Sequence, residues 1–128
     1  MKSAIDHAAA VSAGHINEAT RAWLHIAFSQ WLAGEKLENA LRLDRAARLR
    51  ERNQALLDAA ALVDTGAGPW HTAGKLAQAI RFHRERVAHR IRRDPATELG
   101  ELDKKIHRAL AIGGRCPTSQ RRLHDLIR

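Results

Sequence analysis

The sequence has little of the material from which cross-linked or turn-rich folds are built. It contains one cysteine in 128 residues, so neither a disulfide framework nor a cysteine-rich zinc site is expected. Three prolines and eight glycines are few for an all-β sandwich, which also needs more β-branched residues. Aromatic residues make up only 4% of the chain. These shortages leave a helical domain as the expected class.

Long apolar runs are also missing. The longest, such as residues 59–63, fall far short of the roughly 20 residues that a membrane-spanning helix needs. Asp6 and His7 interrupt the stretch that a signal peptide would require, so the sequence predicts a cytoplasmic protein without a membrane segment. Cys116 fits a reducing compartment, and we interpret it as a small loop residue rather than a nucleophile.

Apolar residues nonetheless form 45% of the chain and charged residues 28%, a globular composition. Apolar positions recur at helical spacing between capping residues and glycine or proline stops. The expected helices span about residues 3–13, 17–32, 35–64, 69–93, 95–112 and 118–128, and the third either runs unbroken or breaks near Asn53. No segment alternates with period two. The sequence therefore predicts an all-α fold, one compact domain over 1–128 with five to six helices in a bundle.

The apolar faces of the second, fourth and fifth helices are expected to form most of the core. The stripe of the fourth helix begins at Trp70 and continues at intervals of three and four residues. The residues expected to be largely buried are Trp23, Phe28, Trp31, Leu76, Ile80, Val87 and Ile106.

The net charge of +8 is distributed unevenly. Residues 1–34 and 35–64 are each neutral, whereas residues 65–94 carry +5 and residues 95–128 carry +3. A uniform distribution would serve solubility alone. An excess confined to the second half points to an anionic partner.

The fourth helix sorts its charge by face. A helical wheel places Phe82, Arg86, His89 and Arg93 opposite the apolar stripe, flanked by Arg81, Arg90 and Arg92. Arginines around an exposed aromatic ring suit phosphate contacts combined with base stacking. They equally suit a protein-binding hot spot. A plain solvated face, with Phe82 covered by a neighbouring segment, is the third reading.

The C-terminal 30 residues resemble a helix–turn–helix arrangement, with Ala109 four residues before the turn glycine Gly113. The last helix opens with side chains able to bond phosphates or base edges, namely Thr118, Ser119, Gln120, Arg121 and Arg122. The turn 113–117 is longer than usual, and Ser119 and Arg122 stand where such motifs favour apolar residues. An ordinary helical hairpin is therefore the simpler interpretation, and the resemblance identifies no family.

No complete catalytic or metal-binding motif is present. The eight histidines lack metal-ligand spacing, and we expect them to be scattered over the surface. The glycines at 66 and 68 lack the spacing of a phosphate-binding loop. We therefore expect no metal, no cofactor and no enzymatic activity.

The leading hypothesis is a small module that binds nucleic acid or a nucleoprotein complex. The alternative is an accessory factor or inhibitor, of the kind carried by phages and mobile elements, that docks on an acidic protein surface of a larger assembly. A third reading is a homodimer formed through the long Ala/Leu/Arg-rich helix. The residues expected to contact the partner are Arg81, Phe82, Arg86, His89, Arg90, Arg93, Ser119, Gln120, Arg121 and Arg122.

Overall fold

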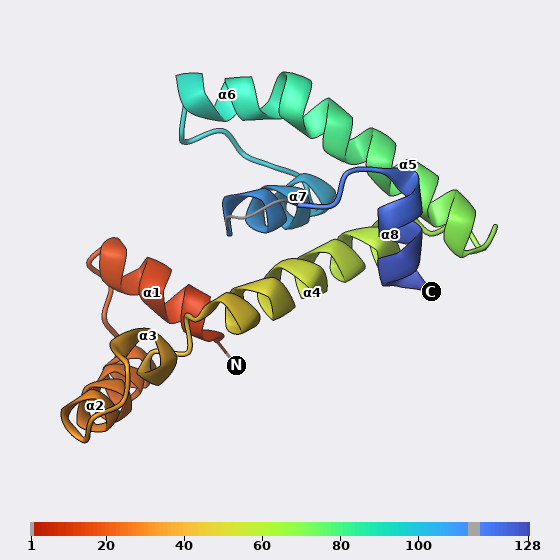
Figure 1. Ribbon diagram of the computed structural model, residues 1–128. Coiled ribbons are helices and arrows are strands. Elements are labelled where there is room, and N and C mark those ends of the chain that lie inside the picture. Colours follow the sequence, from red (N-terminus) through yellow and green to blue (C-terminus); the bar gives the residue numbers. More distant parts are fainter. Residues whose placement is uncertain (1, 113–115) are drawn as a thin grey trace. The chain divides into compact units, whose positions relative to one another are not determined.

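A computed structural model describes residues 2–112 and 116–128 (Figure 1). Every regular element in these two ranges is a helix, which confirms the all-α prediction. The helices pack as bundles within two compact units, Met1–Arg50 and Glu51–Arg128, and the division falls inside helix α4 (Arg45–Val63). Within the described ranges, no helix has both the length and the apolar character needed to cross a membrane.

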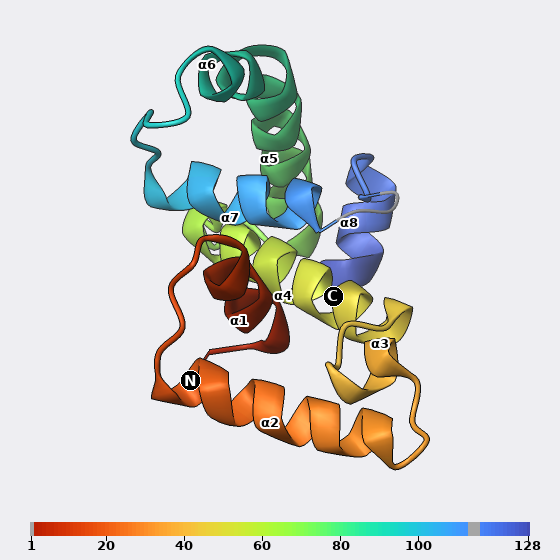
Figure 2. The same ribbon diagram turned by 90° about the vertical axis from the view of Figure 1, so that its left-hand side faces the viewer.

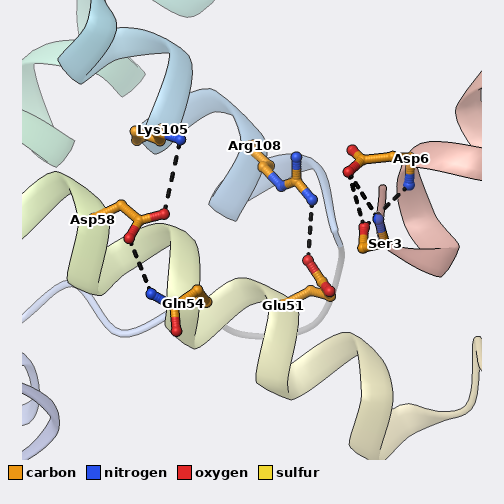
Figure 3. Close-up of polar contacts among 7 residues, drawn as sticks. All are labelled: Ser3, Asp6, Glu51, Gln54, Asp58, Lys105 and Arg108. Carbon is orange, nitrogen blue, oxygen red and sulfur yellow. Dashed lines mark hydrogen bonds and ion pairs between the residues drawn. The ribbon is translucent and has the colours of Figure 1, made fainter. Parts of the chain in front are cut away.

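The first unit contains α1 (Ala4–Ser12), α2 (Glu18–Leu32), α3 (Leu37–Ala40) and the start of α4. Both predicted N-caps are confirmed. The hydroxyl of Ser3 accepts a hydrogen bond from the Asp6 N–H at 3.3 Å, and the Asp6 carboxylate accepts one from the Ser3 N–H at 3.2 Å (Figure 3). The Asn17 side chain accepts from the Thr20 N–H at 2.8 Å.

A histidine lies in the core of this unit. His7 is buried, its Nδ1 lies 2.9 Å from the Thr20 hydroxyl, and its ring stacks on Trp23 at 5.3 Å. Expecting the histidines on the surface was therefore wrong for His7. The hydroxyl partner explains how the buried imidazole is tolerated, because it satisfies one ring nitrogen.

The predicted burial of two aromatic residues on α2 is wrong. Phe28 is 44% exposed and Trp31 is 47% exposed, and they meet each other edge to face at 6.2 Å. The elements that contact α2 within this unit are α1 and α3, which are short, and the fully buried positions of α2 are the small residues Thr20 and Ala27. Short partners cover a narrow strip of a helix, so the bulky side chains beside that strip stay at the surface.

The long helix expected over 35–64 breaks earlier than Asn53. α3 ends at Ala40, and the N–H groups of Arg42 and Leu43 bond back to the carbonyls of Asn39 and Glu38. This pair of bonds is a Schellman cap, which needs a left-handed residue at its centre. Arg42 occupies that position with φ 58°, whereas the equivalent caps of α1 and α2 use Gly14 and Gly34.

We expect Arg42→Gly to stabilise the protein. A left-handed conformation costs a residue with a Cβ about 1–2 kcal/mol, and glycine avoids this cost while losing part of the gain to chain entropy. The free energy of unfolding in urea should rise by about 0.5–1 kcal/mol. Arg42→Ala, which removes the same charge but keeps the strained Cβ, should give no such gain. Equal stability of the two variants would contradict the assignment of strain to Arg42.

The second unit contains the rest of α4 together with α5 (Pro69–Phe82), the π-helical turn η1 (His83–Val87), α6 (Ala88–Arg93), α7 (Glu101–Ala111) and α8 (Gln120–Ile127). α5, η1 and α6 run on as one rod, and α8 lies against the first half of α5 in both views (Figures 1 and 2). The core cluster comprises Ala55, Leu56, Ala59, Ala60, Ala73, Leu76, Ile80, Ile106, Ala109 and Leu123. The predicted burial of Leu76, Ile80, Val87 and Ile106 is confirmed.

Helix α7 begins at Glu101, six residues after the predicted start at Pro95. Asp94 instead organises a turn: its carboxylate accepts from the Ala96 N–H at 3.1 Å, and its carbonyl accepts from the Thr97 hydroxyl at 2.7 Å. These local bonds replace the helical ones that a helix start would make. The predicted stop of this helix, Gly113 and Gly114, lies outside the described residues.

The π-helical turn carries a second buried histidine that the surface prediction missed. His83 is buried, its Nδ1 lies 3.3 Å from an Asp103 carboxylate oxygen, and its ring lies 5.8 Å from that of His107. Its Nε2 is buried without a hydrogen-bond partner among the described residues. The wide turn thus places one polar ring inside the helical core beside α7, while Arg84 to Arg86 remain exposed.

Candidate functional site

The predicted basic face is exposed on the rod formed by α5, η1 and α6. Phe82 is 50% exposed, and Arg86, His89 and Arg93 are exposed as well. The Arg86 guanidinium carbon lies 6.0 Å from the centre of the Phe82 ring, within range of a cation–π contact. The third reading was therefore wrong in one detail, because no neighbouring segment of the described chain covers Phe82.

The arginines of this face lack acidic partners. Arg81, Arg86, Arg90 and Arg93 are exposed, and none forms an ion pair with a residue in the described part of the chain. Arg92 donates a hydrogen bond to His89 Nδ1 at 3.1 Å, which joins two further side chains of the rod. The guanidinium groups are therefore available to an external anion.

The other basic residues of this unit are arranged differently. Arg108 on α7 bonds Glu51 on α4 at 3.0 Å, and Lys105 on α7 approaches Asp58 on α4 at 3.7 Å (Figure 3). These contacts join two helices whose apolar faces meet in the core. The carboxylates of Glu51 and Asp58 on α4 thus form ion pairs with α7. The arginines of the rod named above form none within the described residues.

A groove runs between α5 and the start of α8, with a volume of about 670 Å³. Within the described part of the chain, no acidic residue lines it. Its walls comprise Trp70, His71, Gly74, Lys75, Ala77, Gln78 and Arg81 from the α5 side and Thr118, Ser119 and Gln120 from the α8 side. The structure therefore brings together three of the predicted contact residues, Arg81, Ser119 and Gln120, which lie on different helices.

A glycine in the middle of α5 lies against the first side chain of α8. A Cβ built on Gly74 would lie 2.7 Å from the side-chain nitrogen of Gln120, so the end of that flexible side chain would have to shift. That nitrogen donates a hydrogen bond to the Trp70 carbonyl at 3.0 Å. Glycine in a helix interior costs about 1 kcal/mol of stability relative to alanine. At position 74 the lack of a side chain leaves room for the side chain of Gln120.

The predicted contact residues at the start of α8 differ in what their side chains do: one caps the helix and others are exposed to solvent. Ser119 is the N-cap, and its hydroxyl accepts from the Arg122 N–H at 3.3 Å. Its first role is therefore structural. The side chains of Arg121 and Arg122 are exposed but do not line the groove. The main packing partner of α8 is α5, and the turn residues 113–115 that precede it lie outside the described part of the chain.

Sequence reasoning missed six residues of the groove, all on α5, and four of them carry large or polar side chains. Trp70 was expected in the core but is 53% exposed, and the roles of His71, Lys75 and Gln78 were not recognised. The sequence did contain a signal for these positions. The predicted basic face, which begins at Phe82, can be extended towards the N-terminus in steps of four, three and four residues. Those steps reach Gln78, Lys75 and His71, all of which are exposed.

Cys116 packs against the core of the second unit and is partly buried. Burial raises the pKa of its thiol above the ordinary value, an effect that the nearby Arg52 and Arg84 oppose. A raised pKa favours the unreactive thiol over the thiolate at neutral pH. These properties are those of a packed residue and not of an activated nucleophile.

The described residues contain no cluster of three or more histidine, cysteine or carboxylate side chains able to hold a metal ion. The arrangement offers instead a cationic ridge, two exposed aromatic rings and a polar groove. Comparisons of the chain with known families, curated proteins and solved structures found no significant match.

Proposed function

We propose that the protein is a small cytoplasmic, non-enzymatic module that binds nucleic acid through the rod formed by α5, η1 and α6. One observation carries this proposal. Exposed arginines that form no ion pair within residues 2–112 and 116–128 follow one continuous helix, from Arg81 to Arg93, and lead into a groove that no acidic residue of these ranges lines. Phosphates repeat at regular intervals along a strand, so a linear array of guanidinium groups matches them. On α7, by contrast, Lys105 and Arg108 are paired with carboxylates of α4.

The aromatic residue within the ridge supports nucleic acid over a simple anion. Phe82 is half exposed beside the Arg86 guanidinium. Apolar surface beside a phosphate site is costly in water unless it contacts something, and base–aromatic stacking supplies that contact. The first turn of α8, with Arg121 and Arg122, extends the cationic surface, and His89 adds an exposed polar ring to the rod.

A second candidate function is docking on a protein partner, as an accessory factor would do. The observation that favours it lies in the first unit, where Phe28, Trp31 and Leu32 on α2 are all substantially exposed. Such residues are enriched in protein interfaces. Docking on an acidic protein surface would use the basic face, whereas this patch lies on α2, so variants on α2 test it separately from nucleic-acid binding.

The salt dependence of binding tests the first function. We expect fluorescence anisotropy with a labelled oligonucleotide to give an affinity that falls steeply with salt, because bound arginines release counterions. Arg86→Gln combined with Arg93→Gln should reduce the slope of log K against log salt concentration by about 1.4–1.8, which corresponds to two phosphate contacts. The double variant Arg45→Gln/Arg50→Gln, which removes two exposed charges from α4, should leave the slope unchanged.

The proposal fails if the parent protein binds neither duplex nor single strands at low salt. It also fails if both double variants reduce the slope equally, since that result would describe a diffuse effect of net charge. In either case docking on a protein becomes the leading function.

A further inference from the structure

The groove between α5 and α8 has an aromatic end and a cationic end. Trp70 lies in the first turn of α5, and Arg81 lies eleven residues further on, about 16 Å along the helix axis. Lys75 and Gln78 lie between them on exposed positions. The groove volume of about 670 Å³ falls within the range of about 300–1,000 Å³ that is typical of ligand sites.

The indole of Trp70 is held in place without being covered. The Trp70 carbonyl is bound by the Gln120 side chain at 3.0 Å, and Pro69 precedes it at the start of the helix. Its ring meets His124 nearly at right angles, at 79° and 5.4 Å between ring centres. A perpendicular neighbour covers at most one face of the indole, and 53% of the residue remains exposed. A flat partner can therefore stack on the other face.

The groove carries two positively charged side chains in addition to the Trp70 ring. Lys75 and Arg81 form no ion pair with any residue of the described ranges. The backbone N–H of Gln120, which lines the groove at the start of α8, also has no hydrogen-bond partner among the described residues. Free N–H groups at a helix N-terminus favour a negative charge. Beside Trp70, the groove thus provides cationic and N–H groups for a phosphate.

We propose that this groove binds single-stranded nucleic acid, with one base stacked on Trp70 and adjacent phosphates bound by Lys75 and Arg81. The inference rests on the proposed nucleic-acid binding and adds a preference for unpaired strands. Bases in a duplex are stacked on both faces, so only an unstacked base can lie flat on an indole within a groove. The arginines beyond Arg81 contact phosphates, which single strands and duplexes both present, whereas a base stacked on Phe82 also has to be unpaired.

Replacing the indole tests the preference. We expect Trp70→Leu to weaken binding of a fluorescein-labelled oligo-dT strand by about 10-fold or more and to change binding of a duplex by less than about 2-fold. Trp31→Leu is the matched control, because Trp31 is exposed to a similar extent (47%) but lies on α2, outside the groove. Oligo-rU measured in parallel tells whether the strand is RNA or DNA, and a loss on either strand supports the inference.

The outcomes separate this inference from the function on which it rests. If the parent binds no strand at low salt, the proposed function itself fails. If the parent binds but Trp70→Leu behaves like Trp31→Leu, or weakens single-strand and duplex binding equally, the inference is overturned while nucleic-acid binding stands.

A second measurement covers the case in which Trp70→Leu does not fold. The parent labelled with 5-fluorotryptophan has three fluorine resonances, one for each tryptophan. Conservative Trp→Phe variants at Trp23 and Trp31 assign two of them, and the remaining one belongs to Trp70. Addition of oligo-dT should shift the Trp70 resonance and leave that of Trp31 in place. An unmoved Trp70 resonance at saturation would overturn the inference.

Discussion

Ile80→Ala is expected to lower the free energy of unfolding by about 2–5 kcal/mol. Ile80 is fully buried on α5, in the cluster to which α4, α7 and α8 also contribute. Removing its side chain loses the transfer free energy of three carbon atoms and leaves a cavity that the three surrounding helices close only in part. Urea denaturation followed by far-ultraviolet circular dichroism measures the loss.

The same substitution at an exposed isoleucine provides the control. Ile26 on α2 is 56% exposed, so Ile26→Ala removes the same atoms from a site that is already hydrated. Its cost should stay below about 1 kcal/mol. Similar losses for the two variants would mean that the buried cluster around Ile80 is not the core of the second unit.

Reversing two charges on the rod is expected to have the largest effect on binding. Arg86→Glu combined with Arg93→Glu removes two charge-assisted contacts to phosphate and adds repulsion at both positions. Contacts to charged groups contribute about 1.5–3 kcal/mol each, so the affinity for an oligonucleotide should fall by about 100-fold or more at moderate salt. Both side chains are exposed and without ion-pair partners among the described residues, so the fold should be retained.

The control for charge reversal lies on α4. Arg45→Glu combined with Arg50→Glu changes the net charge by the same amount at two exposed positions outside the proposed interface. Side chains that make no contact with phosphate act only through general repulsion, which salt screens, so this variant should weaken binding much less. Equal losses in the two double variants would contradict a localised interface.

Local signals in the sequence predicted the helix ends with most success. Ser3 and Asn17 cap their helices as expected, and Gly14 and Gly34 adopt the left-handed conformation that ends them. Such features depend on residues close in sequence, which is why one sequence suffices to find them. The failure at Arg42 has the same origin, because arginine in a glycine-like position gives no local signal of the turn that it makes.

Burial could be predicted only where a helix has several neighbours. The stripe of α5 meets α4, α7 and α8, and its apolar residues Leu76 and Ile80 are buried as expected. Phe28 on α2 follows the same periodicity but lies beside short partners and stays at the surface. Periodicity defines a face, whereas its burial depends on the width of the elements that cover it.

The candidate site was predicted in part. The wheel placed Phe82 and its arginines on an exposed face, because that face lies on one helix and depends on local geometry. The groove could not be predicted, because it forms where the start of α8 meets Gly74, and that contact joins residues more than 40 positions apart. Trp70 shows the consequence, since its apolar character indicated the core while packing left it at the rim of the groove.

A nitrogen-15 chemical-shift titration with an unlabelled oligo-dT strand tests the central claim most directly, because it reports on every backbone amide at once. The account predicts that shifts at low salt concentrate in residues 70–93 and 118–122, on α5, η1, α6 and the start of α8, and that they disappear as salt is raised. Shifts concentrated on α2, or an unchanged spectrum at millimolar strand concentration, would contradict a nucleic-acid interface on this rod.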